Sequence, residues 1–381
     1  MELRHAAGNL LVVGLAGKEL SAMERAWLKL IRPAGIILYK RNIADAPQTR
    51  AMLKESLAYC TPHAVSFVDV EGGTVNRLNE ALAVIPSAQA VARAMLHPTL
   101  SQKARKDGAP NVRSVLAREH GELIARAVAA FGFNTSLAPM IDLALPDSAE
   151  VLGTRCPARE PAGVIAYARE FLIGLKSRGI VGCGKHFPGL GGGTRDSHLE
   201  TPAIQRDGAD IWRDDLEPYR ALSDEMPIVM INHAAYPMTP GRQRPASVSS
   251  YWIQSILRKR IGYRGIVLSD DLEMGGILKF MPIEDAAIEA IRTGSDLIEI
   301  CHHAEPILQA YEALVSEGER SAAFRKLLLE QARITERKRA RVFPRAMPPA
   351  LNKRQFEALQ TRILRFGETI AAAQPAEVHT A

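Results

Sequence analysis

A glycine-rich stretch at residues 185–198, KHFPGLGGGTRDSH, holds more titratable groups than a plain connecting loop needs. Lys185 and His186 open it, four glycines follow within five positions, and Asp196 and His198 lie near its end. Glycine permits sharp turns, whereas unpaired Lys, His and Asp side chains are costly to bury. A local turn would bring Asp196 to one imidazole nitrogen of His198 and leave the other free for proton transfer. We predict an active-site loop, although a surface turn is the commoner setting of a bare Asp-Ser-His.

Two other stretches place charged residues directly after strand-like segments. In GIVLSDDLEM, Asp270 follows a buried, β-branched run and would project into a pocket, unless Asp270 or Asp271 is a helix N-cap. In VDVEGGTVNRL, Asp69 and Arg77 flank two glycines. A carboxylate and a guanidinium suit sugar hydroxyls, and they also suit an ion pair that closes the loop. Arg155 in VLGTRCP, together with Lys185 and His186, adds hydrogen-bond donors.

Apolar runs alternate with amphipathic segments from near the N-terminus to about residue 319, which indicates β-α units around a parallel sheet. The eight predicted strands are LLVVGLA (10–16), GIILY (35–39), AVSFVD (64–69), TSLAPMID (135–142), IVGCGKH (180–186), PIVMINH (227–233), GIVLSD (265–270) and DLIEI (296–300). The predicted helices between them span 21–31, 49–60, 111–130, 162–178, 210–224, 249–260 and 283–292. The first of these helices opens with a capping box at Ser21 and Glu24. Eight repeats predict a TIM (β/α)8 barrel, and the alternative is a doubly wound sheet in two domains.

The barrel prediction places catalytic groups at the carboxyl ends of the strands. Ionisable residues do lie at the ends of predicted strands, among them Asp69, Lys185 with His186, His233, and Asp270. Any one such residue is more often structural than functional, but four at one rim indicate a site. His233 in MINHAAYP is either part of the pocket wall or a satisfied core histidine.

We assign residues 1–319 to the barrel domain, 320–372 to a basic helical extension packed on or beside it, and 373–381 to a disordered tail. The extension is predicted to contain helices at about 321–341 and 353–372, after a helix at about 304–317. Residues 320–365 contain 13 Lys and Arg against 3 Asp and Glu, whereas the rest of the chain contains 35 against 39. The main body therefore lacks the basic surface that nucleic-acid binding requires.

Composition and cysteine usage restrict the class of protein. The chain has 381 residues with 47% hydrophobic and 24% charged residues, enough for a large globular core. It has no apolar run of roughly 18–20 residues, and no cleavage pattern follows the short apolar run 10–16. The four cysteines are widely spaced and form no CxxC pair. We expect a cytoplasmic protein, most simply a monomer, with reduced thiols, no membrane span and no nucleic-acid partner.

Taken together, these phrases resemble glycoside hydrolase family 3, and most closely its single-domain bacterial branch of β-N-acetylglucosaminidases of peptidoglycan recycling. The resemblance covers most of residues 10–300 and is carried, in order, by GIILYKRNI, FVDVEGGTVNRL, GFNTSLAPMIDL, KHFPG, DSHLETP, RPASVSS and GIVLSDDLEM. KHFPG followed by DSH is the most specific part. The branch commonly has KHFPGHGDT, whereas here Leu190 replaces the second His and Gly192 and Gly193 replace Asp-Thr.

The resemblance implies a role for each candidate residue. Asp270 would be the nucleophile, His198 the general acid/base and Asp196 its partner. Five residues match positions that bind the terminal amino sugar: Asp69, Arg77, Arg155, Lys185 and His186. The implied reaction is exo-acting, retaining hydrolysis of terminal N-acetyl-β-glucosamine from peptidoglycan-derived saccharides through a covalent glycosyl-aspartate. It needs neither a metal nor an organic cofactor, and its only implied partner is a small carbohydrate substrate.

Several alternatives stay open at this point. The chain could be a β-glucosidase or another family 3 exo-β-glycosidase. Because a histidine acid does not repel phosphate, it could also be a phosphorylase. Lys185 at a strand end could form a Schiff base, as in an aldolase, although Asp270 and the DSH loop would then lack roles. A non-catalytic sugar-binding barrel is the last alternative, and Leu190 and Gly192 are the only hint of it.

Overall fold

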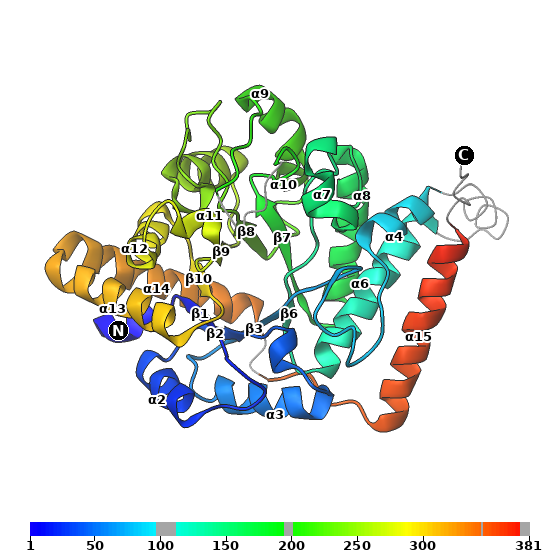
Figure 1. The fold of residues 1–381 in the computed structure, drawn as a ribbon, viewed down its shortest axis with the longest axis horizontal. Coiled ribbons are helices and arrows are strands. Elements are labelled where there is room, and N and C mark those ends of the chain that lie inside the picture. The colour runs from blue at the N-terminus through cyan, green and yellow to red at the C-terminus, as the bar shows by residue number, and fades with distance from the viewer. Residues whose placement is uncertain (97–111, 194–200, 344–345, 374–381) are drawn as a thin grey trace.

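A closed barrel of eight parallel strands forms the centre of the molecule (Figure 1). The computed structural model describes residues 1–96, 112–193, 201–343 and 346–373. The barrel strands are β1 (Leu11–Gly14), β2 (Gly35–Ile37), β3 (Val65–Val68), β6 (Thr135–Ser136), β7 (Val181–Phe187), β8 (Ile228–Ile231), β9 (Ile266–Asp271) and β10 (Leu297–Ile300). They follow one another around the barrel in this order, and β10 pairs with β1 to close it. The predicted TIM-type barrel is confirmed, and each predicted strand overlaps one of these.

Side chains along the strands alternate between the barrel interior and the surrounding helices. In β9, Ile266 and Leu268 belong to the interior cluster, whereas Val267 belongs to the cluster between strands and helices. In β10, Leu297 faces the interior and Ile298 faces outward. The interior is therefore filled with apolar side chains, as in other TIM barrels, and forms a floor beneath the carboxyl ends of the strands.

Helices surround the barrel (Figure 1). The longer ones are α2 (Ala22–Ile31), α3 (Ala46–Leu57), α4 (Ala88–Met95), α6 (Val112–Ala130), α8 (Pro161–Lys176), α12 (Ile283–Thr293), α13 (Ala304–Arg320), α14 (Ala322–Val342) and α15 (Lys353–Ala372). Shorter ones are α1 (Leu3–Gly8), α7 (Ala149–Leu152), α9 (Gly208–Asp210), α10 (Glu217–Ala221) and α11 (Gly275–Leu278). Ser21 and Glu24 form the predicted capping box at the start of α2. No helix in the described part of the chain is long and apolar enough to cross a membrane.

Some elements differ from the sequence prediction. The helix expected over 210–224 is divided into α9, a π-helical turn at Ile211–Asp215 and α10, and the helix expected over 249–260 is π-helical at Tyr251–Ile261. The helices α1 and α4 were not predicted, nor was the hairpin of β4 (Val70–Gly72) and β5 (Val75–Asn76). Gly72 and Gly73 have φ values of 90° and 63°, which only glycine adopts readily, so they allow the hairpin to turn.

The helix α14 closes the base of the barrel. Its Arg339 is fully buried and donates hydrogen bonds to the carbonyl oxygens of Ala34 (3.0 Å) and His63 (3.2 Å), which precede β2 and β3. Lys338 binds the carboxylate of Asp296, directly before β10, at 2.8 Å. These contacts join the amino ends of three strands to one helix. We therefore propose that the basic extension of residues 320–372 folds as one unit with the barrel.

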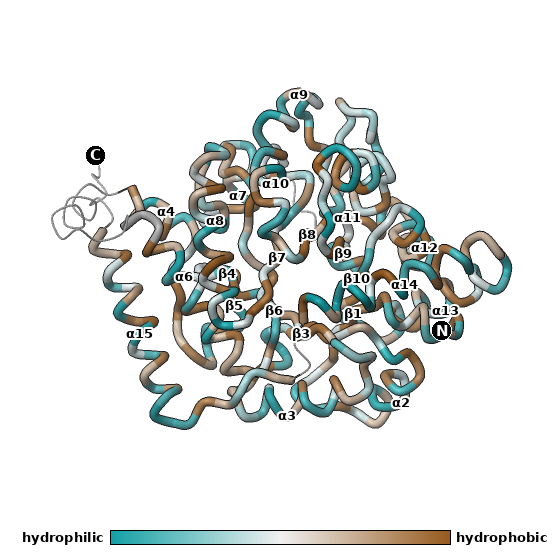
Figure 2. Tube along the Cα trace, turned by 180° about the vertical axis from the view of Figure 1, so that it is seen from behind, coloured by the Kyte–Doolittle hydropathy of each residue, from teal (hydrophilic) through white to brown (hydrophobic). Residues whose placement is uncertain are grey.

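The last helix, α15, packs against α4 and α6 on the outside of the barrel (Figure 1). Its buried residues are spaced at helical intervals: Leu359, Ile363, Phe366 and Ile370. Figure 2 shows the matching alternation of hydrophobic and hydrophilic residues along α15. Within the tail predicted over 373–381, residues 374–381 lie outside the described part of the chain.

Candidate active site

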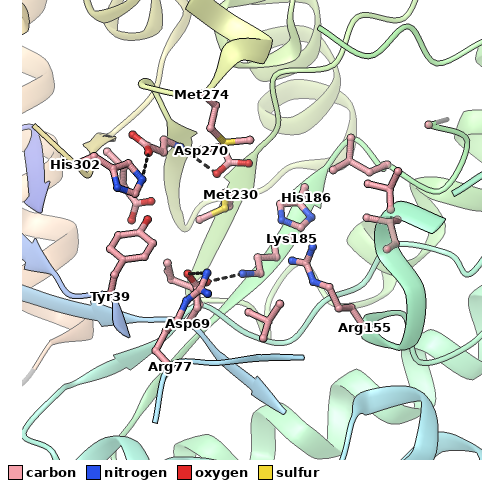
Figure 3. A pocket seen from close by; sticks show the side chains of 18 residues that line it. Tyr39, Asp69, Arg77, Arg155, Lys185, His186, Met230, Asp270, Met274 and His302 are labelled. Carbon is pink, nitrogen blue, oxygen red and sulfur yellow. Dashed lines mark hydrogen bonds and ion pairs between the residues drawn. The ribbon is translucent and has the colours of Figure 1, made fainter. Parts of the chain in front are cut away.

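A cavity of about 410 Å³ opens at the carboxyl ends of the barrel strands (Figure 3). Its charged lining residues come from segments far apart in the sequence: Asp69, Arg77, Arg155, Lys185, His186, Asp270, Asp271, Glu299 and His302. The structure thus brings together six of the eight predicted site residues, all except Asp196 and His198. Four of these six, Asp69, Lys185, His186 and Asp270, come from the ends of predicted strands.

A buried network of charges forms one wall of the cavity. Lys185 Nζ lies 2.8 Å from Asp69 Oδ1 and 2.7 Å from Glu71 Oε1. Arg155 donates two hydrogen bonds to the Glu71 carboxylate, each of 2.9 Å. Arg77 lies 3.5 Å from the other oxygen of Asp69. Two carboxylates and three cations therefore share this wall, and the hairpin β4–β5 supplies Glu71.

The charged state of this network follows from its pairing. Burial alone would raise the pKa of Asp69, but Lys185 and Arg77 more than offset it, so the pKa is lowered. Burial also opposes ionisation of Glu71, yet Arg155 and Lys185 hold its pKa well below the ordinary value. For Lys185, burial would lower the pKa, but Asp69 and Glu71 raise it. Because a Schiff base requires a neutral amine, the raised pKa of Lys185 argues against the aldolase alternative.

His186 is oriented by Asp142, which ends the predicted strand TSLAPMID. The Nδ1 atom of His186 lies 2.8 Å from Asp142 Oδ2, and the other carboxylate oxygen accepts a hydrogen bond of 2.8 Å from the backbone N–H of Leu190. The Nε2 atom of His186 has no partner among the described residues, and the side chain lines the cavity. Asp142 therefore acts on the site through His186 and through the start of the glycine-rich loop.

The two adjacent acids at the end of β9 have different surroundings. The Asp271 carboxylate accepts hydrogen bonds from the backbone N–H groups of Glu273 (3.0 Å) and Cys301 (3.2 Å), and its Oδ2 lies 3.2 Å from His302 Nε2. Asp270 accepts one bond, of 3.0 Å, from the N–H of Asp271. Its Oδ2 has no partner in the described part of the chain and faces the cavity. Neither acid is a helix N-cap, because both lie within β9 and α11 begins at Gly275.

His233 is a satisfied core histidine. It is fully buried, with Nδ1 at 2.7 Å from the hydroxyl of Ser247 and Nε2 donating to the carbonyl oxygen of Asp271 at 2.9 Å. It does not line the cavity. The structure therefore supports the interpretation of His233 as a satisfied core histidine and not as part of the pocket wall.

The predicted pair Asp196 and His198 lies within residues 194–200, outside the described part of the chain. The described residues on either side are close to the site. Gly193 lines the cavity, and Thr201 donates a hydrogen bond of 2.6 Å to the carbonyl oxygen of Gly276 in α11.

Some charged residues of the site were not predicted from the sequence: Glu71 and Asp142, which bind lining residues, and Glu299 and His302, which line the cavity. Two of them carried a usable signal, because Glu71 lies in the VDVEGG phrase and Asp142 ends a predicted strand. Glu299 lies inside the apolar run DLIEI. Whether it faces the interior depends on the strand register, which the sequence does not reveal.

A (β/α)8 barrel with a charged cavity at the carboxyl ends of its strands has the architecture of the barrel enzymes. The chain matches the glycosyl hydrolase family 3 N terminal domain over residues 2–336 and belongs to this family. It is therefore a glycoside hydrolase, and a carbohydrate is its substrate.

Relatives and solved structures agree with this membership. The chain is 31% identical to the beta-hexosaminidase of Idiomarina loihiensis over 315 residues, 83% of this chain and 90% of that protein. A family 3 β-N-acetylglucosaminidase from Paenibacillus sp. superposes with a TM-score of 0.81 at 27% identity, covering 96% of this chain and 69% of the other. Native NagZ from Neisseria gonorrhoeae gives a TM-score of 0.71 at 27% identity, covering 96% and 98%.

Proposed function

We propose that this chain is an exo-acting, retaining β-N-acetylglucosaminidase that removes terminal N-acetyl-β-glucosamine from peptidoglycan-derived saccharides. The observation that carries the proposal is the Asp270 carboxylate, which lines a cavity with charged walls and whose Oδ2 has no partner among the described residues. Family membership and the relatives named beta-hexosaminidase support the choice of substrate.

In the first step, Asp270 Oδ2 attacks the anomeric carbon of the terminal sugar while the bond from that carbon to the leaving oxygen breaks. His198 gives its proton to the departing oxygen, and a glycosyl-Asp270 ester forms. Asp196 fixes the imidazole orientation and stabilises its charged form. The roles of Asp196 and His198 rest on the family resemblance of the DSH phrase.

In the second step, His198 takes a proton from a water molecule, whose oxygen attacks the anomeric carbon. The ester bond breaks, the Asp270 carboxylate is restored, and the sugar leaves with its original configuration. Two inversions at one carbon give net retention. Asp271 is unsuited to this role because backbone N–H groups and His302 occupy its carboxylate.

The cavity accounts for an exo mode of action. Asp69, Arg155 and Lys185 form its charged wall, and the apolar interior of the barrel closes it below. A cavity closed at its inner end receives a chain terminus, and a long polysaccharide cannot pass through it. A site that hydrogen-bonds each sugar substituent also rejects analogues lacking one, because its own polar groups are then left unpaired.

Hydrolysis of paired chromogenic substrates tests the proposal. An aryl N-acetyl-β-glucosaminide should be cleaved faster than the matching β-glucoside, and chitin oligosaccharides should lose single sugars from the non-reducing end. Asp270→Asn should abolish both reactions, while the exposed control Asp285→Asn should retain them. Faster cleavage of the β-glucoside or release of mid-chain fragments would overturn the assignment, and a sugar phosphate formed in phosphate buffer would identify a phosphorylase.

We also propose that the protein acts in the cytoplasm as a monomer. Its four cysteines are unpaired, and three of them, Cys156, Cys183 and Cys301, are buried. Free thiols are typical of a reducing compartment. Size-exclusion chromatography with light scattering tests the monomer, and fractionation of the producing cells tests the location.

A further inference from the structure

Glu299 is a carboxyl group in the barrel interior that the proposed reaction does not use. Leu297, two residues earlier in β10, belongs to the apolar interior cluster, so the strand alternation points Glu299 inward as well. Glu299 is 2% exposed and lines the cavity that contains Asp270. An inward position of a barrel strand normally carries an apolar side chain.

The Glu299 side chain lacks a partner for one of its oxygens. Its Oε1 is buried and has no hydrogen-bond partner among the described residues. The backbone of Glu299 is satisfied, because its N–H donates to Ser269 Oγ (3.1 Å) and its carbonyl oxygen accepts from the N–H of Leu272 (2.9 Å). Buried polar atoms in folded proteins are almost always hydrogen-bonded. The Glu299 side chain also lines the cavity, so a ligand held there can contact its carboxyl group.

The charges facing Glu299 are mostly negative. Asp270 and Asp271 approach from β9 and Asp69 from the end of β3, while the charge of Lys185 on β7 opposes them. Tyr39 and Cys301 also face Glu299, and burial raises the pKa of each, so both are neutral.

These surroundings determine the protonation state of Glu299. Burial is the largest cause, and repulsion from Asp270, Asp69 and Asp271 adds to it, so the pKa of Glu299 is raised well above its ordinary value. Lys185 opposes the shift only in part. A protonated carboxyl group donates one hydrogen bond, whereas a carboxylate only accepts.

We propose that Glu299 is a further sugar-binding residue, which as a neutral acid donates a hydrogen bond to the sugar held beside Asp270. The identity of the sugar rests on the proposed function. In its neutral form Glu299 adds no negative charge next to the nucleophile. Ionised, it would withdraw the donor and repel the Asp270 carboxylate, so sugar binding should weaken as the pH rises through the pKa of Glu299.

Two substitutions separate the hydrogen bond from the shape of the side chain. Glu299→Gln keeps a donor of the same length, and Glu299→Leu keeps a similar volume without one. With N-acetylglucosamine as the calorimetric probe at neutral pH, the Gln variant should bind within about threefold of wild type and the Leu variant about tenfold more weakly. The exposed control Glu357→Gln should equal wild type. Wild-type affinity in the Leu variant, or no binding by the wild type, would overturn the proposal.

A spectroscopic measurement tests the protonation state without turnover. The infrared band of protonated carboxyl groups at neutral pH, to which Asp215 also contributes, should lose the Glu299 component in Glu299→Gln and keep it in the wild type and in Glu357→Gln. An unchanged spectrum in Glu299→Gln would overturn the neutral-acid assignment. If no N-acetyl-β-glucosaminide is hydrolysed, the proposed function fails, and the infrared result still decides the state of Glu299.

The pH profile supplies a kinetic test. With an activated aryl leaving group, cleavage does not depend on protonation by His198. The wild-type kcat/KM should therefore fall on the alkaline side only as Glu299 ionises, and Glu299→Gln should remove that fall. The same alkaline fall in both proteins would contradict the proposal.

Discussion

Lys185 and Glu71 form a buried ion pair in the cavity wall, with 2.7 Å between Nζ and Oε1 and no more than 3% of either side chain exposed. Lys185 also binds Asp69, and Glu71 also binds Arg155. Breaking a buried pair leaves an uncompensated charge, so each member holds the others in place. The positions of the proposed sugar-binding side chains therefore depend on every member of this network of ion pairs.

Loss of one member should affect both stability and activity. Lys185→Met leaves Asp69 and Glu71 buried without their shared cation, and it should lower the free energy of unfolding by about 3–5 kcal/mol. It should also reduce kcat/KM about a hundredfold or more. The double variant Lys185→Met/Glu71→Gln should regain part of the stability and none of the activity. Denaturant unfolding measures these free energies. If the losses caused by Lys185→Met and Glu71→Gln simply add up in the double variant, the two residues are not coupled.

Asp215 should make stability depend on pH near neutrality. It is buried below the glycine-rich loop, where a Cβ on Gly189 would lie 2.9 Å from its Oδ1. Burial raises its pKa to about 7, although Arg206, at 3.0 Å, opposes the shift. Because the folded state holds this proton more tightly than the unfolded state, the free energy of unfolding should fall as the pH rises from about 4 to about 7.

Neutral variants test the sign of this effect. Asp215→Asn should remove the decline in unfolding free energy over that pH range. The neighbouring Asp214 is a matched control with the opposite sign, because its ion pairs with Arg213 and Arg206 outweigh burial and lower its pKa. Asp214→Asn should leave the decline intact. An unchanged slope in Asp215→Asn, measured by denaturant unfolding at a series of pH values, would show that another group is responsible.

Arg339 should be important for stability although it is far from the cavity. Arg339→Met leaves the carbonyl oxygens of Ala34 and His63 and the hydroxyl of Thr61 without their buried donor. We expect a loss of about 2–4 kcal/mol in the free energy of unfolding. Arg337→Met, an exposed position on the same helix, should change stability little. Equal stability of both variants would contradict the proposal that α14 folds as one unit with the barrel.

Much of the fold was predictable because each barrel strand is a short apolar run between turn signals. The departures have local causes. The helix α1 spans only six residues, too few to show a helical period. The π-helical segment at Tyr251–Ile261 keeps the composition of an ordinary helix, so its altered hydrogen bonding leaves no mark on the pattern.

The site was predictable where its residues end strands and unpredictable where a partner decides their position. Asp69, Lys185 and Asp270 followed from the strand-end rule. Asp142 also ends a predicted strand and could have been predicted in the same way, but only the fold shows that it binds His186. Glu299 looked like part of an apolar strand, and its place in the cavity depends on the barrel register.

His198 should matter in proportion to the need for a proton at the departing oxygen. His198→Ala should slow aryl glycosides with poor leaving groups much more than those with good ones, because only the former depend on protonation. Asp196→Ala should weaken the same step less, since it loosens the imidazole without removing it. Steady-state kinetics over a series of substituted phenols measures this, and equal losses across the series would indicate a structural histidine.

The central claim is that the Asp270 carboxylate forms a covalent bond with the sugar. A slow, fluorinated N-acetyl-β-glucosaminide should allow the glycosyl-enzyme to accumulate, and digestion followed by mass spectrometry then locates the sugar. We predict that the label is found on Asp270, whose Oδ2 faces the cavity, and that it is absent from Asp270→Asn. A label on Asp271, or complete turnover with no labelled peptide, would contradict the account.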